Sequence, residues 1–286
     1  MIIFCLISSI ILSTIINLMS KNISDLSFGT KNFFKAQTVI FACGSIVLLI
    51  FTGNPFEELA IETVFYAVIY GALLLTAQYC YTASLKNGNI GICSTVYSLG
   101  FVLPTISGCI FWGEPISIFN ILGILLVIPA IIISGKKPGA NKSSGTGYII
   151  PLIFAMVASG GLGIMQKIQQ SSAFPQQRNS FIIIAFAVAS VVSLIFSLVN
   201  LKENGKIAPK KIVSAGILGS AFAAANLLNT FLAGKLDSAV FFPVLNIGSI
   251  LFSLISGMIL FKEKLIKKDY VVITLGIISI LLITVL

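Results

Sequence analysis

Charged residues are scarce in this chain, and they occur in clusters. Only 9% of its 286 residues are charged, against roughly 25% in an average soluble domain. Between the clusters lie ten uncharged stretches of at least seventeen residues, at 1–20, 36–56, 63–85, 87–113, 115–135, 143–166, 179–201, 212–234, 238–261 and 270–286. A helix needs about 20 apolar residues to cross a ~30 Å hydrocarbon layer. The sequence therefore predicts a polytopic membrane protein with ten spans.

The spans are predicted to be helices because every backbone N–H and C=O in lipid needs an internal partner. Strands of a membrane barrel would instead alternate apolar and polar residues over about ten positions. The fold class predicted is therefore all-α. The chain has no histidine, and its five cysteines lack the pair spacing of a metal site. We expect no metal, no cofactor and no catalytic residues, so we do not expect an enzyme.

The net charge of +9 comes from basic residues in the predicted loops and does not indicate nucleic-acid binding. Fifteen of the eighteen basic residues fall on one side of the predicted membrane, and only Lys167, Arg178 and Lys235 fall on the other. Cytoplasmic loops retain Lys and Arg. The distribution predicts a multi-pass protein of the cytoplasmic (plasma) membrane with both termini outside.

The chain is predicted to consist of two repeats of five helices, residues 1–135 and 148–286, joined by a polar linker at 136–147. The two halves match in register at an offset of about 148 residues. Within the third and eighth spans, Gly71, Gln78 and Thr82 correspond to Gly219, Asn226 and Thr230. The spacing i, i+7, i+11 places each trio on one helical face.

An odd number of spans inverts the second repeat relative to the first. The loop 51–62 contains three Glu and no Lys, whereas its counterpart 201–211 contains four Lys. Equivalent loops of opposite charge are what inverted copies require under the positive-inside rule. Many secondary transporters use inverted repeats to expose a midplane site alternately to the two sides. We therefore expect a central cavity.

Two short turns point to a family. Trp112-Gly113-Glu114-Pro115 closes the fourth span, and Phe261-Lys262-Glu263-Lys264 closes the ninth. With ten short-looped spans in two halves, the chain resembles the EamA-like branch of the drug/metabolite transporter superfamily. The first span lacks the Trp-Gly pair common in that family. The resemblance implies a basket of two inverted halves whose cavity is lined by spans one, three, four, six, eight and nine.

Candidate binding residues are uncharged polar groups near the middle of these spans, because a desolvated ligand needs replacement partners. They are Ser13, Asn17, Gln78, Thr82, Tyr97, Ser98, Gln166, Asn226, Asn229, Asn246 and Ser249. For Gln78, Asn226 and Asn246, structural bonds between helices are the alternative. At equivalent span ends lie Lys86, Glu114, Lys235 and Glu263, where gating competes with snorkelling or ion pairing.

These observations predict a secondary transporter that moves a small neutral or zwitterionic metabolite, such as an amino acid, by alternating access. No acid lies at mid-span, so proton exchange lacks its obvious carrier. Alternatives are an exchanger of anionic phosphorylated metabolites, a carrier of quaternary amines, and a non-transporting accessory subunit. The expected partners are the small-molecule substrate and the lipid bilayer, without nucleic acid, and a homodimer is left open.

Overall fold

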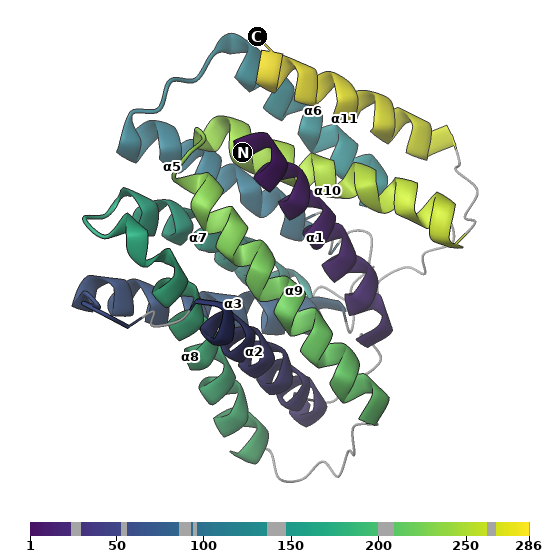
Figure 1. The fold of residues 1–286 in the computed structure, drawn as a ribbon. Coiled ribbons are helices and arrows are strands. Elements are labelled where there is room, and N and C mark those ends of the chain that lie inside the picture. Colours follow the sequence, from purple (N-terminus) through teal and green to yellow (C-terminus); the bar gives the residue numbers. More distant parts are fainter. Residues whose placement is uncertain are drawn as a thin grey trace. The chain divides into compact units, whose positions relative to one another are not determined.

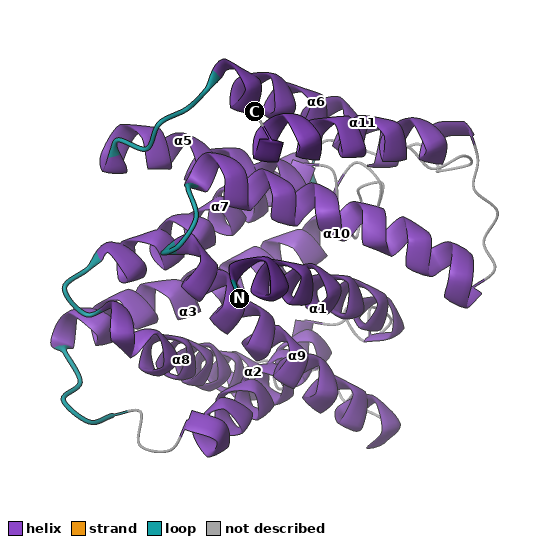
Figure 2. Ribbon diagram, turned by 45° about the horizontal axis from the view of Figure 1, so that its top comes forward, coloured by secondary structure: helices purple, strands orange, loops and turns teal. Residues whose placement is uncertain are grey.

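The computed structural model describes residues 1–23, 30–52, 56–85, 93, 96–135, 147–199, 209–261 and 267–285. Every regular element in these ranges is a helix (Figure 2). The α-helices are α1 (Ile2–Ile23), α2 (Thr30–Thr52), α3 (Ile61–Leu85), α5 (Val102–Trp112), α6 (Ile118–Gly135), α7 (Ile149–Ser171), α8 (Arg178–Val199), α9 (Pro209–Ala233), α10 (Ser238–Phe261) and α11 (Lys267–Val285), with 3-10 turns η2 (Leu99–Phe101) and η3 (Pro175–Gln177). Each overlaps one predicted uncharged stretch, so the all-helical class is confirmed.

The turn between α5 and α6 shows how the sequence sets helix ends. Gly113 ends α5 in the left-handed region (φ 61°), a conformation that glycine adopts without a Cβ clash. Ser117 and Asn120 then cap α6 reciprocally. The Asn120 side-chain oxygen accepts from the Ser117 N–H at 2.9 Å, and the Asn120 N–H donates to Ser117 Oγ at 3.1 Å. This reciprocal pair has the geometry of a capping box.

Several helices are suited to a bilayer. Among the described residues, α2, α3, α7, α8 and α9 are long and apolar enough to cross it, and the other α-helices contribute shorter apolar segments. Large apolar side chains also lie on the surface: Ile50 is 71% exposed, Phe154 59% and Ile195 53%. A soluble monomeric protein rarely exposes apolar surface on this scale. The chain is an integral membrane protein.

The helices pack in two compact units. Unit 1 comprises Met1–Tyr79 and Met165–Gly234, and unit 2 comprises Cys80–Ile164 and Lys235–Leu286. Each unit therefore contains helices from both predicted repeats.

In unit 1, α2 packs against both α8 and α9, and α1 packs against α9 (Figure 1). The Phe41 and Phe186 rings meet edge to face at 5.4 Å, and both are fully buried. A Cβ on Gly219 would collide with the Ile40 carbonyl oxygen, so the glycine allows α2 and α9 to approach at backbone distance, as small residues do in membrane helices. Gly219 therefore has a packing role.

The contact between α2 and α8 is antiparallel. Ser45 Oγ donates to the Ile183 carbonyl at 3.0 Å, and Ser190 Oγ donates to the Thr38 carbonyl at 3.2 Å. Residue numbers thus rise along α2 as they fall along α8. These two helices correspond to the second and seventh predicted spans.

In unit 2, α6 packs against α11 and α5 packs against α10. Asn120 Nδ2 donates to the Ile283 carbonyl at 3.1 Å, and Ser279 Oγ donates to the Gly123 carbonyl at 2.8 Å. The α6–α11 contact is therefore antiparallel too, and it joins the fifth and tenth predicted spans.

Candidate functional site

A buried polar network lies inside unit 1 and connects three helices. Gln166 Nε2 on α7 donates to the Tyr70 hydroxyl on α3 at 2.8 Å. The same hydroxyl donates to Asn226 Oδ1 on α9 at 2.6 Å. Tyr70 is fully buried, and Gln166 and Asn226 are 5% and 6% exposed. We call these three residues the Tyr70 network. Its members are all uncharged.

The α9 helix holds its part of the network in position. Asn226 Nδ2 donates to the Phe222 carbonyl one turn earlier at 2.8 Å, which fixes which amide atom faces Tyr70. Thr230 Oγ1 donates to the Asn226 carbonyl at 2.8 Å. Polar side chains in lipid-embedded helices satisfy themselves in this way when water is absent. The orientation of Asn226 therefore follows from its own helix.

The Tyr70 ring is fixed by packing. It lies 4.9 Å from the Phe181 ring of α8, centroid to centroid. A buried aromatic ring fixed at this position aims its hydroxyl at a defined point. Tyr70 is therefore the hub of the network, since its one oxygen both donates and accepts.

A second polar contact joins α1 to α9 in the same unit. Ser9 Oγ donates to Asn229 Oδ1, and Ser9 is fully buried. Asn229 follows Asn226 by one turn, so α9 carries both contacts. Two helices, α1 and α3, thus bond to polar side chains of α9, and α7 is linked to α9 through Tyr70.

The end of α7 carries further buried polar groups. Lys167, directly after Gln166, is only 8% exposed, and Gln169 is fully buried. Gln169 Nε2 donates to the Phe174 carbonyl at 3.1 Å. A buried lysine needs compensating partners. Its burial departs from the snorkelling that its place near a span end suggested.

The polar candidates of unit 2 are arranged differently. Asn246 Nδ2 donates to the Phe242 carbonyl at 2.9 Å, and Ser249 Oγ donates to the Asn246 carbonyl at 2.9 Å. Both bonds stay within α10. The rings of Tyr81 and Tyr97 lie 4.8 Å apart.

The predicted binding residues divide between the two units. Ser13, Gln78, Gln166, Asn226 and Asn229 lie in unit 1, and Thr82, Tyr97, Ser98, Asn246 and Ser249 lie in unit 2. Gln78 and Thr82 are half-buried, and the described part of the chain offers neither side chain a hydrogen-bond partner. The side chain of Asn17 lies outside the described residues. A single cavity lined by both groups stays a prediction.

The four span-end charges are only partly described. Lys86 and Glu263 lie outside the described residues, and Lys235 is exposed. Glu114 Oε2 accepts from the Ser238 backbone N–H, the first of α10, at 2.7 Å. A carboxylate at this place satisfies an unpaired N–H and complements the helix dipole. Glu114, in the turn that suggested the family, thus fixes the start of α10, a helix of the second predicted repeat.

Tyr70 is the member of the network that sequence reasoning did not select. Tyrosine in a span is more often an interfacial anchor, and nothing in the Tyr70 neighbourhood of the sequence marks it as a hub. The usable signal was its spacing, since Tyr70 lies two turns before Gln78 on α3. Among the described residues, no group of three cysteines or acids could hold a metal ion.

The comparisons with known proteins agree with this picture. Residues 1–135 match the model of the EamA-like transporter family. The resemblance inferred from the sequence is confirmed for these residues, which form the first predicted repeat. The match points to a membrane transporter of the drug/metabolite type. One solved crystal structure superposes with a TM-score of 0.76 at 11% identity over 99% of this chain and 96% of that chain, which shows a shared fold. No curated protein sequence matches the chain.

Proposed function

We propose that this EamA-like protein is a secondary transporter of a small neutral or zwitterionic metabolite, such as an amino acid, in the plasma membrane. The observation that carries the proposal is the Tyr70 network, because it places uncharged donors and acceptors inside a bundle of apolar helices. Such groups replace the hydration of a small polar solute. Gln166 contributes an amide oxygen that has no partner among the described residues.

Alternating access between two inverted repeats of five spans is the proposed mechanism. It is supported by the antiparallel contacts of α2 with α8 and of α6 with α11. Each pair joins helices that occupy the same position in the two repeats. Corresponding helices of inverted copies run in opposite directions. With ten spans, the charge bias of the loops places both termini outside.

Uptake into proteoliposomes tests the proposal. Proteoliposomes that contain the purified protein and one unlabelled amino acid in their lumen should exchange it for the labelled form outside. The double substitution Gln166→Ala with Asn226→Ala should abolish the exchange. Ser193→Ala is the matched control, because Ser193 is also fully buried and, among the described residues, bonds only to the Ala189 carbonyl of its own helix. Exchange that survives the double substitution, or that is lost equally in the control, would refute the site.

Lys167 favours a second candidate, exchange of an anionic phosphorylated metabolite. This cation is buried in unit 1 next to Gln166, and a buried lysine supplies a point charge for phosphate. Under this alternative, flux of a sugar phosphate exceeds that of any amino acid, and Lys167→Gln abolishes it. Under the leading proposal, amino acid flux survives the Lys167→Gln substitution, or the protein only binds the carboxylate of the amino acid more weakly.

A further inference from the structure

Four helix ends of unit 1 meet on one side of the Tyr70 network. Gln177 of η3, directly before α8, ties the start of α8 to the start of α3. Its Nε2 donates to the Glu58 carbonyl at 2.9 Å, and its Oε1 accepts from the Ala60 N–H at 3.2 Å. The end of α9 touches the end of α7, because a Cβ on Gly234 would lie only 2.8 Å from Gln170 Cβ. We call this side the closed end of unit 1.

The Tyr70 network lies a short way beneath the closed end. Gln166 lies five residues before the end of α7, Asn226 seven residues before the end of α9, and Tyr70 nine residues after the start of α3. These separations correspond to about 7–14 Å along the helices. Thr230 and Gln169, which lie between the network and the closed end on α9 and α7, are fully buried. A solute could therefore reach the network from this side only if the closed end opened.

Side-chain amides make up the seal at the closed end. Gln169 Nε2 donates to the Phe174 carbonyl at 3.1 Å. Gln170 Nε2 donates to the Pro175 carbonyl at 3.0 Å and to Gln169 Oε1. We call Gln169, Gln170 and Gln177 the glutamine cap. The carbonyls that accept from the cap lie in the turns before α8 and α3, so these bonds are not fixed with a helix.

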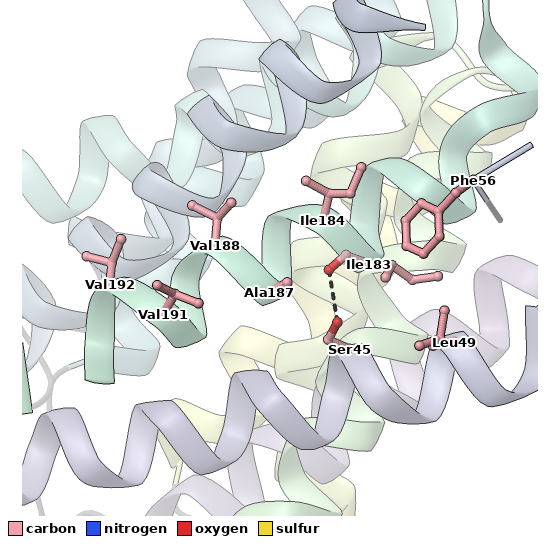
Figure 3. Close-up of a pocket in the computed structure, with 9 residues that line it drawn as sticks. All are labelled: Ser45, Leu49, Phe56, Ile183, Ile184, Ala187, Val188, Val191 and Val192. Atoms are coloured by element: carbon pink, nitrogen blue, oxygen red, sulfur yellow. Dashed lines mark hydrogen bonds between the residues drawn. The ribbon is translucent and has the colours of Figure 1, made fainter. Parts of the chain in front are cut away.

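The turn before α3 is held at two places, and its backbone is strained where the cap binds it. Phe56 lies at one end of an apolar hollow of about 450 Å³ between α2 and α8, next to Ile183 (Figure 3). The bonds of Gln177 hold the other end of the turn. Glu58, whose carbonyl accepts one of these bonds, has a φ of 51°, which non-glycine residues seldom adopt. Breaking the Gln177 bonds would let the turn leave this strained conformation.

We propose that the glutamine cap is a gate of the transporter and that Gln177 is its latch. In the closed state the amides bond to carbonyls of the turns, and in the open state they bond to water while the turns 56–60 and 172–177 separate. An amide that exchanges a carbonyl for water changes the free energy little, whereas an apolar seal would expose hydrocarbon to water. Relief of the strain at Glu58 also favours opening. The inference rests on the proposed transport function, which requires access to the Tyr70 network.

Thiol labelling of Thr230→Cys tests the gate without a substrate. The five native cysteines are replaced by alanine, and an impermeant methanethiosulfonate reagent is added to intact cells or to inverted membrane vesicles. Thr230 is fully buried, so the reagent reaches the new thiol only when the closed end opens. We expect slow labelling from one side of the membrane. Adding Gln177→Met, which removes both bonds at similar side-chain length, should make labelling from that side about ten-fold faster.

Two further variants separate the latch from a general loss of stability. Gln176→Met is the matched control and should label at the parent rate, because Gln176 is the exposed neighbour of Gln177 in η3. Glu58→Gly, added to Gln177→Met, should slow the labelling again, because glycine adopts a positive φ without strain. If Gln177→Met does not fold, Gln177→Glu keeps the acceptor for the Ala60 N–H, loses the donor and should label at an intermediate rate.

Equal labelling rates in the parent, Gln177→Met and Gln176→Met would overturn the gate, as would equally fast labelling from both sides. Failure of the proposed function gives a different result. The faster labelling of Gln177→Met in a protein that exchanges no amino acid would support the gate and refute the proposed substrate. Amino acid exchange with labelling unchanged by Gln177→Met would overturn the gate alone.

Discussion

The polar bonds that join helices differ between the Tyr70 network of unit 1 and two contacts of unit 2, the contact of the α5–α6 turn with α10 and the contact of α6 with α11. In the Tyr70 network, side chains bond to one another. In unit 2, Glu114, Asn120 and Ser279 bond to backbone groups of the neighbouring helix. A bond between two side chains can be exchanged for a ligand when either group rotates, whereas a bond to backbone is fixed with its helix. The first kind suits a binding site, and the second stabilises a scaffold.

Two asparagines show the same contrast on a smaller scale. Asn226 and Asn246 both donate their amide to the carbonyl one turn earlier, at 2.8 and 2.9 Å. The side-chain oxygen of Asn226 accepts from Tyr70. That of Asn246 has no partner in the described part of the chain. Two residues of the same type thus contribute differently to the contacts between helices, according to which group faces the side-chain oxygen.

Removing the hub should have the largest effect. Tyr70→Phe deletes one hydroxyl and removes the bonds that Asn226 Oδ1 and Gln166 Nε2 make to it, at a cost of about 2 kcal/mol of unfolding free energy. Thermal unfolding of the purified protein measures it, with Ser193→Ala as control. We expect amino acid exchange to fall as well. A Tyr70→Phe protein as stable and active as the parent would mean that the network is dispensable.

Removing the bond between Glu114 and the Ser238 N–H should have the second-largest effect on stability. Glu114→Ala removes the cap of α10 and should cost about 1 kcal/mol, seen as a lower melting temperature. Substrate affinity in the folded protein should stay unchanged, because the bond is directed to backbone. If exchange is instead lost with no change in melting temperature, Glu114 acts in gating and the contrast drawn here is wrong.

A double-mutant cycle measures the coupling through Tyr70. Gln166→Ala and Asn226→Ala, singly and together, should show a coupling of about 0.6 kcal/mol, the average for interhelical bonds in a membrane protein. Repeating the cycle in the Tyr70→Phe background should bring the coupling to zero. Coupling that persists without the hydroxyl would require another route between α7 and α9.

Asn246→Ala should have the smallest effect on stability, within about 0.5 kcal/mol, because its only described bond is to its own helix. The unpartnered oxygen nevertheless predicts a lower affinity in the exchange assay. Ser249→Ala, one turn further on α10, controls for the loss of a hydroxyl that is already satisfied. Equal exchange by all three proteins would remove Asn246 from the set of candidate binding residues.

Much of the helical layout could be predicted from the spacing of charges. The uncharged stretch 238–261 coincides with α10, Ser238–Phe261, because charged side chains are excluded from the hydrocarbon at both ends. The stretch 87–113 was less informative. The described residues 96–112 there are helical, but they include the 3-10 turn Leu99–Phe101 directly before α5, and the spacing of charges gives no sign of this change in the helix.

The pairing of polar groups could not be predicted in the same way. The repeat suggested that Gln78 and Asn226 act together, but Asn226 bonds to Tyr70 instead. Correspondence between repeats relates positions by symmetry and says nothing about which atoms meet. The burial of Lys167 was also missed, because a position next to a predicted span end does not show whether the side chain is covered in the folded protein.

The packing of unit 1 joins helices that are synthesised at different times. Its α2 and α8 are joined by a bond whose two residues lie 138 positions apart in the chain. At about 5–20 residues per second, the ribosome takes about 7–28 s to synthesise the 138 residues between the two bonded positions. During that interval the newly inserted α2 has only lipid, or an insertion chaperone, against the surface around Phe41. A truncation before α8 should therefore leave this helix inserted without its final neighbours and open to quality-control proteases.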